Sequence, residues 1–69
     1  MEKLAERIKA LRLERGMTQV QLGDAVGLDQ RFISNIESGR KSVSVETLII
    51  FANFFKVTMD YLVGRTDTL

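Results

Sequence analysis

Four polar side chains fall within one short stretch of the sequence and could form hydrogen bonds with the edges of nucleobases. They are Gln30, Arg31, Ser34 and Asn35. A glutamine amide can pair with adenine through two hydrogen bonds, and an arginine guanidinium can pair with O6 and N7 of guanine. In a helix, Ile33 and Ile36 would share an inward side, which leaves the polar side chains facing outward. The stretch therefore predicts a helix with one polar face suited to reading bases.

Two short helices joined by a tight turn are predicted to position these side chains, at residues 18–25 and 29–38. Thr18 is a good N-cap for the first helix, and Asp29 is a good N-cap for the second. Gly27 suits the positive φ at which one helix ends and the chain turns away. On an isolated helix the same polar residues would be ordinary surface residues. After a capped glycine turn they favour a helix-turn-helix that reads DNA.

Residues on either side of the predicted reading helix could bind the phosphate groups of DNA. The first backbone amides of the helix at residues 18–25 form a ready anion site, and Thr18 and Gln19 lie at that end. Arg40 and Lys41 follow the second helix in a glycine-containing loop and could contact the DNA backbone beyond it. These four residues are the predicted phosphate contacts.

The same stretch resembles a known family. The pattern T-Q-x-x-L-x-x-x-x-G-x-D-x-x-x-I-S-x-I-E-x-G is similar to the xenobiotic-response-element family of helix-turn-helix regulators, which includes the lambdoid phage repressors and Cro proteins. The likeness continues in R-I-K-A-L-R-L-E-R-G upstream and in S-V-E-T-L-I-I-F-A-N-F-F-K-V-T-M-D-Y-L downstream, so it covers nearly the whole chain. It departs from the family at Gly23, where alanine is usual, and near Val43, where a proline is often found.

The remaining chain predicts further helices. Apolar residues recur at helical spacing in residues 2–15 and 45–55. The second of these segments is rich in residues that favour strands, but no partner strand exists elsewhere. Thr58 is expected to cap a last short helix through Val63, and the tail at 65–69 is expected to fray. The predicted fold is an all-α, compact bundle of five short helices, a lambda-repressor-like DNA-binding domain with the helix-turn-helix at its second and third helices.

Arg12 and Glu37 are predicted to form an ion pair. Arg12 lies next to the apolar stripe of the first helix, and Glu37 falls on the inward side of its own helix. Stranding either charge near a small core would cost about 3–5 kcal/mol, which favours a pair. The alternative is that both long side chains extend to solvent. In the family that the sequence resembles, an arginine and a glutamate at the matching positions pair in this way.

The helix at residues 45–55 has more apolar surface than one buried face needs. An apolar patch on a small domain usually marks a surface for a partner, here a homodimer, because helix-turn-helix proteins commonly read two-fold operators. The alternative is a few scattered exposed hydrophobic residues. The side chains predicted for this dimer interface are Ile50, Phe54, Met59 and Tyr61.

Composition limits the other functions. The 69 residues allow one small domain, 1–69, and the absence of Cys and His excludes thiolate and histidine metal sites and the commonest general base. We therefore expect no enzyme, metal, cofactor or small-molecule ligand. The longest apolar run, 48–52, is too short to span a bilayer, and the expected location is the cytoplasm. The net charge of +1 is weak for a nucleic-acid binder, so any positive field would have to be local.

The sequence thus predicts a DNA-binding transcriptional regulator, a repressor, that inserts residues 29–38 into the major groove of double-stranded DNA as a homodimer on a two-fold operator. The alternative is a protein-interaction module with the same fold, antitoxin-like or a partner of a regulator, without strong DNA binding. The near-neutral charge and the apolar fourth helix favour that alternative. The polar face of residues 29–38 argues against it.

Overall fold

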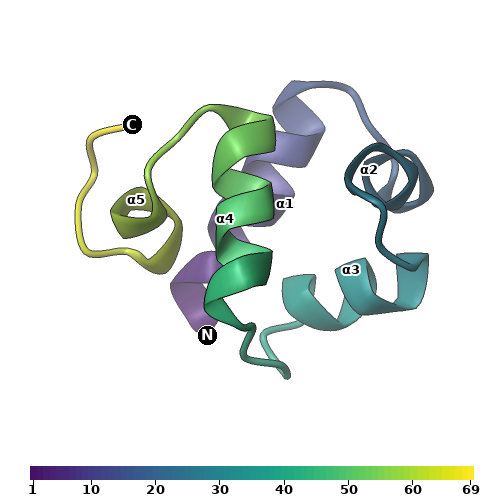
Figure 1. Ribbon diagram of the computed structural model, residues 1–69, viewed down its shortest axis with the longest axis horizontal. Coiled ribbons are helices and arrows are strands. Elements are labelled where there is room, and N and C mark those ends of the chain that lie inside the picture. The colour runs from purple at the N-terminus through teal and green to yellow at the C-terminus, as the bar shows by residue number, and fades with distance from the viewer.

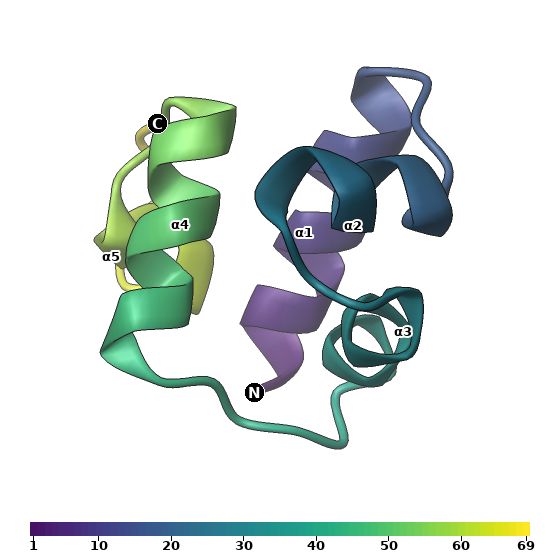
Figure 2. The same cartoon turned by 45° about the vertical axis from the view of Figure 1, so that its right-hand side comes forward.

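The computed structural model describes residues 1–69 and contains five helices and no strand. The helices are α1 (Glu2–Glu14), α2 (Gln19–Val26), α3 (Gln30–Glu37), α4 (Val45–Phe55) and α5 (Met59–Val63). In Figure 1, α4 crosses in front of α1, with α2 and α3 on one side of this pair and α5 on the other. Figure 2 shows the loop from α3 to α4 running along the lower edge of the domain. The predicted all-α bundle of five short helices is confirmed.

A single hydrophobic core joins all five helices. Each helix contributes at least one side chain with no accessible surface, and burying a side chain of this size stabilises the fold by about 1.5–3 kcal/mol. These side chains are Ile8, Leu22, Ile33, Ile36, Phe51 and Leu62. Two of them, Ile33 and Ile36, belong to α3 and anchor one face of this helix in the core. The opposite face of α3 must then point toward solvent. None of the helices combines the length and apolar character needed to cross a membrane.

The helices begin where the sequence predicted. Thr18, Asp29, Ser44 and Thr58 each accept a hydrogen bond at the first turn of α2, α3, α4 and α5, respectively. The segment of α4 is helical despite its strand-favouring composition, because helical spacing places Phe51 and Phe55 on one buried face. At the end of α1 the C-cap is Arg15, and Gly16 follows it with φ +67°.

Two glycines shape the turn between α2 and α3. Gly27 adopts φ +76° and ends α2, as the sequence predicted. Gly23 is buried inside α2, and a Cβ atom at this position would lie 2.5 Å from the carbonyl oxygen of Leu28. The Leu28 amide also donates to the Gly23 carbonyl at 2.8 Å. Gly23 therefore permits close approach of the turn that leads into α3.

The segment after α5 contacts α1 at Thr66 and Asp67. Arg7 donates to the carbonyl oxygens of Tyr61 and Thr66, both at 2.6 Å, and to the Asp67 carboxylate at 2.7 Å. Its guanidinium also lies 4.1 Å from the centre of the Tyr61 ring. Several acceptors converge on this half-buried cation and hold the tail.

Candidate nucleic-acid interface

The polar residues predicted to read bases share the side of α3 that does not face the core. Gln30 and Arg31, at the start of the helix, are exposed, and Ser34 and Asn35, one turn later, are half-buried. Ile33, between these pairs, is fully buried. The N-terminal half of α3 is therefore the most accessible part of its polar face.

Side-chain caps fix the starts of both α2 and α3. The Asp29 carboxylate accepts from the Arg31 amide at 2.7 Å, which fixes the first turn of α3. At the start of α2, the Thr18 hydroxyl accepts from the Gln21 amide at 3.0 Å, and the Gln21 side chain accepts from the Thr18 amide at 2.8 Å. These caps fix where α2 and α3 begin, and the capping residues Thr18 and Asp29 are both exposed.

Arg12 and Glu37 form the ion pair that the sequence predicted. Arg12 Nε lies 2.7 Å from Glu37 Oε2, and Arg12 Nη2 lies 2.9 Å from Glu37 Oε1. The side chains are 9% and 4% exposed, and Arg12 Nη1 also donates to the Met17 carbonyl at 2.7 Å. The hydrogen bond with Glu37 raises the pKa of Arg12, although burial opposes this effect. The pair ties α1 to the end of α3.

Two glutamines connect this ion pair to the exposed start of α3. Gln19 Nε2 donates to Glu37 Oε1 at 3.3 Å, and Gln30 Nε2 donates to Gln19 Oε1 at 2.9 Å. From the sequence we predicted separate phosphate and base contacts for the two glutamines and did not predict the bond between them. The available signal was that each glutamine is the first residue of its helix, on either side of the same turn.

A polar hollow of about 280 Å³ lies beside these contacts, where α1, α2 and α3 meet. No apolar side chain lines it. Its lining residues are Lys9, Arg12, Gln19, Ser34, Glu37 and Ser38. Lys9 and Ser38 were not among the predicted site residues, and the structure places them next to the other four lining residues, which were.

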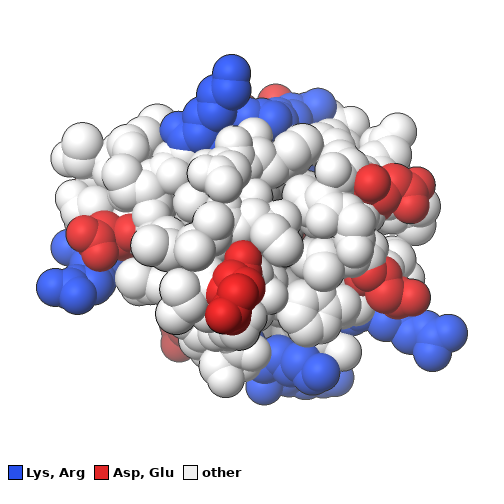
Figure 3. All heavy atoms as spheres, in the orientation of Figure 1, with Lys and Arg blue, Asp and Glu red and all other residues white.

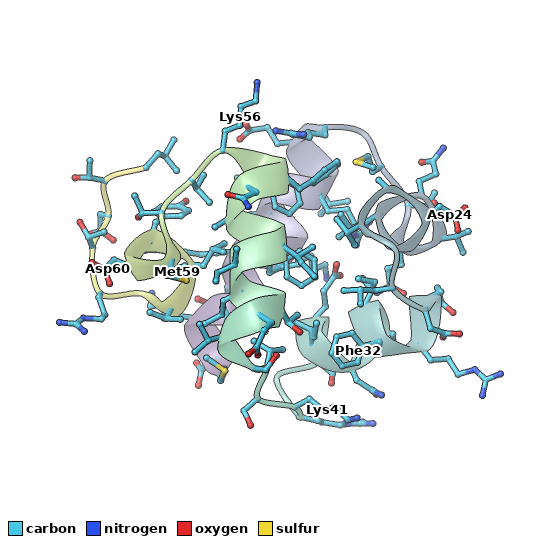
Figure 4. The ribbon with its side chains drawn as sticks, viewed as in Figure 1. Asp24, Phe32, Lys41, Lys56, Met59 and Asp60 are labelled. Carbon is cyan, nitrogen blue, oxygen red and sulfur yellow. The ribbon has the colours of Figure 1, made fainter.

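The loop after α3 carries the two remaining predicted phosphate contacts, Arg40 and Lys41, and both are exposed. The Lys41 ammonium lies 5.6 Å from the centre of the Phe32 ring, and Figure 4 shows the two side chains next to each other. Phe32 itself is half-buried and packs against the core. Its aromatic ring thus provides a place for the Lys41 cation beside the polar face of α3.

An exposed apolar surface covers part of α4 and the start of α5. Of the predicted interface residues, Ile50 and Met59 are 38% and 41% exposed, whereas Phe54 and Tyr61 are half-buried beneath arginine guanidinium groups. Val45 and Ile49 of α4 are also exposed and were not predicted, although their i,i+4 spacing could have indicated a shared face. We call the exposed residues Val45, Ile49, Ile50 and Met59 the α4 patch.

The face over α4 is mostly uncharged, apart from acidic atoms near its lower end (Figure 3). Lysine and arginine side chains lie around the margin of this face. The labelled Met59 lies on the same side of the molecule as α4 (Figure 4). The α4 patch lies on α4 and the start of α5, whereas the polar residues of α3 lie on a helix to one side of α4 (Figure 1).

A five-helix domain in which a capped glycine turn presents a polar helix has the architecture of a helix-turn-helix DNA-binding domain. Residues 8–62 match the helix-turn-helix family, and the chain belongs to this family, whose members are DNA-binding transcriptional regulators rather than enzymes. The family resemblance found in the sequence is thus confirmed.

Several relatives support this assignment. The chain is 36% identical over 62 residues to the immunity repressor protein of Bacillus phage phi105, covering 90% of this chain and 43% of that protein. It is 31% identical over 64 residues to the control protein C.SmaI of Serratia marcescens, covering 93% of this chain and 76% of that protein. The chain spans about half the length or less of most curated relatives that it matches.

A solved structure shows the same fold. The restriction-modification controller protein C.AhdI from Aeromonas hydrophila superposes with a TM-score of 0.79 at 26% identity. The match covers 88% of this chain and 92% of that chain. The five-helix arrangement is therefore shared across nearly the full length of both proteins.

Proposed function

We propose that this chain is a transcriptional repressor that places α3 in the major groove of a two-fold DNA operator. One observation carries the proposal: the outer face of α3 is polar and accessible at its N-terminal half, and the inner face is anchored in the core. Helix-turn-helix proteins use this end of the second helix to contact base edges. The likeness to a phage immunity repressor supports repression as the outcome of binding.

Within this proposal, the side chains of α3 have distinct roles. Gln30 pairs with adenine, Arg31 pairs with O6 and N7 of guanine, and Ser34 and Asn35 reach neighbouring bases or phosphates. Each good bidentate contact is worth about 1–3 kcal/mol of discrimination against the wrong base. The exposure of Gln30 and Arg31 makes them the main source of sequence preference.

The DNA backbone is held from two sides of α3. Thr18 and Gln19 stand at the start of α2, where backbone amides attract a phosphate, and Arg40 and Lys41 lie in the loop beyond the end of α3. Contacts of this kind supply affinity that falls with salt concentration and does not depend on base sequence. They explain how a chain with a net charge of only +1 can still bind DNA.

A homodimer matches the proposed two-fold operator. The interface consists of the predicted residues Ile50, Phe54, Met59 and Tyr61, extended along α4 by Val45 and Ile49. Because the α4 patch and the polar residues of α3 lie on different helices, two copies could pair there and leave both reading helices free. As a DNA-binding regulator of this kind, the protein would act in the cytoplasm, where its operator lies.

Selection of bound duplexes from a random pool tests the proposal. The expected result is one enriched motif with two-fold symmetry and half-sites about 34 Å apart, one turn of DNA, or a multiple of that distance. Recovery of no motif, together with binding that does not weaken as salt is raised, would reject the proposed function.

The α4 patch also favours a second candidate, a protein-interaction module that keeps the fold without strong DNA binding. A mobility shift with random duplex DNA at two salt concentrations separates the candidates. A repressor gives a shift that weakens with salt, because phosphate contacts release counterions. An interaction module gives no shift at either concentration.

A further inference from the structure

We propose that Phe32 is a positioning residue that holds the Lys41 ammonium at the edge of α3, where the lysine binds a DNA phosphate. The inference rests on the proposed function, in which Lys41 contacts the DNA backbone while α3 lies in the major groove. It assigns to Phe32, which has no part in the proposed base contacts, an effect on affinity that acts through Lys41.

Phe32 lies at the edge between the two faces of α3. Ile36, four residues later, is fully buried, and Asn35, three residues later, belongs to the polar face. The Phe32 side chain is half-buried and packs against the hydrophobic core. The core therefore holds the ring in place, while the rest of the ring remains accessible from solvent.

The loop that carries Lys41 has few contacts of its own to fix it. Residues 40–44 belong to no helix, and no backbone–backbone hydrogen bond involves residues 41–43. The hydrogen bonds that follow α3 end at the Arg40 amide, which donates to the Ser38 hydroxyl at 3.3 Å. Lys41 also forms no ion pair. Its long side chain can therefore adopt many conformations unless another contact restricts it.

The Phe32 ring supplies that contact. The Lys41 ammonium lies 5.6 Å from the centre of the ring, within the range of a cation–π interaction, and Figure 4 shows the two side chains next to each other. An ammonium has three N–H groups, so one that lies over a ring can still donate to a phosphate oxygen. The ring thus reduces the conformational freedom that Lys41 must lose when it binds DNA.

The substitution Phe32→Leu tests this role, because leucine removes the ring and keeps an apolar side chain for the core. A cation–π contact at an exposed site corresponds to about a two- to fivefold change in affinity. We therefore expect Phe32→Leu to weaken binding to operator and random duplexes alike by about two- to fivefold. Phe32→Tyr retains the ring and should bind both duplexes as the wild-type protein does.

Double variants show whether the effect acts through Lys41. In a Lys41→Ala background Phe32→Leu should cause no further loss of affinity, whereas in an Arg40→Ala background it should cause the full loss. Arg40 is the matched control, because it is an exposed cation of the same loop and lies over no aromatic ring. Equal losses in both backgrounds would reject the positioning role. A loss confined to the operator duplex would also reject it, because α3 itself would then have moved.

A measurement without DNA separates this inference from the proposed function. In the NMR spectrum of the free protein, the ring should shift the ε-methylene protons of Lys41 upfield, and Phe32→Leu should return them to ordinary lysine positions. If these protons have ordinary positions in the wild-type protein, the contact does not persist in solution and the inference is wrong. An upfield shift in a protein that binds no duplex would instead reject the proposed function, and with it the role of Phe32 in binding.

Discussion

At the scale of single residues, the two exposed side chains at the start of α3 and the two cations after its end have different expected effects on binding. Gln30 and Arg31 are exposed at the N-terminal end of α3, the end that we propose to approach base edges. Lys41, in contrast, lies in the loop beyond α3, next to the Phe32 ring, and its proposed contact is with phosphate alone. Base contacts set sequence preference, whereas phosphate contacts set overall affinity.

We predict that Arg31→Ala relaxes the base preference at one position of the operator by about 1–3 kcal/mol, because it removes a bidentate contact with guanine. Lys41→Ala should weaken binding to all sequences alike and reduce the slope of log affinity against log salt by about one. Titration of operator and random duplexes at several salt concentrations measures both effects. Equal changes in base preference for the two variants would show that these roles are wrongly assigned.

The buried pair of Arg12 and Glu37 should be strongly coupled. Removal of either partner by Arg12→Ala or Glu37→Ala leaves an unpaired buried charge, and we expect each to lower the free energy of unfolding by about 3–5 kcal/mol. The double variant should lose much less free energy of unfolding than the sum of the two single losses. A double-mutant cycle by urea denaturation measures this coupling. Independent, additive losses would mean that the two side chains do not stabilise each other.

The pH dependence of this contribution has a defined sign. Because pairing raises the pKa of Arg12, the guanidinium binds its proton more tightly in the folded protein. Its contribution is therefore fully present at every pH below the ordinary pKa of arginine and is lost only as pH rises through the higher folded value. The arginine side of the pair should not weaken the fold across the neutral range.

At the scale of elements, the turn between α2 and α3 depends on Gly23. We predict that Gly23→Ala lowers the free energy of unfolding by about 1–3 kcal/mol, because the added Cβ would lie 2.5 Å from the Leu28 carbonyl oxygen, a backbone atom. Thermal and urea denaturation measure the loss. The exposed neighbour Asp24, labelled in Figure 4, provides the matched control, and Asp24→Ala should change stability by no more than about 0.5 kcal/mol.

A rise in the free energy of unfolding of Gly23→Ala would also be informative. Helix propensity alone predicts that alanine stabilises α2 by about 1 kcal/mol. Alanine is the usual residue here in the family that the sequence resembles. A stabilised Gly23→Ala variant would therefore show that the turn can move away at little cost, and that the close approach does not constrain α3.

Local patterns predicted the elements because caps and helical spacing act within a few residues of the chain. Thr18, Gly27 and Asp29 each fulfil a requirement of the backbone next to them, so the turn was visible in the sequence. The bond between Gln19 and Gln30 depends on the angle at which two helices meet, and no local pattern records that angle. The same reason explains why the contacts of Arg7 with the tail were missed.

The contacts of Arg7 with the tail give a prediction of their own. Arg7→Ala removes the donor that binds the Tyr61 and Thr66 carbonyls and the Asp67 carboxylate, so residues 65–67 should become mobile. Heteronuclear NOE values of the backbone amides should fall for this segment while those of α3 stay unchanged. Glu14→Ala, on the same helix, is the control, because Glu14 is an exposed residue at the end of α1. Unchanged NOE values in Arg7→Ala would show that other contacts hold the tail.

At the scale of the whole molecule, the polar face of α3 and the α4 patch are separate surfaces. The α3 face is lined by residues that can bind DNA, and the α4 patch offers apolar side chains that are 38–60% exposed. An exposed apolar cluster on a small domain commonly marks a partner surface. A dimer formed there would place two reading helices under one two-fold axis, as a two-fold operator requires.

This arrangement predicts that a charge in the α4 patch separates dimerisation from folding. Ile49 is 42% exposed, so Ile49→Glu should leave the monomer folded while its carboxylate prevents burial between two copies. In sedimentation at high protein concentration without DNA, the wild-type protein should be dimeric and the variant monomeric. Affinity for the full operator should fall by about tenfold or more, because the second half-site is no longer bound intramolecularly.

Leu13→Glu is the matched control, because Leu13 is 57% exposed on α1 and lies outside the α4 patch. It introduces the same charge in place of a similar side chain and should leave both the dimer and the operator affinity unchanged. Binding to an isolated half-site should be the same for the wild-type protein and both variants, since no copy needs a partner to occupy one half-site. If the wild-type protein sediments only as a monomer, or if both variants dissociate the dimer, the α4 patch is not the interface.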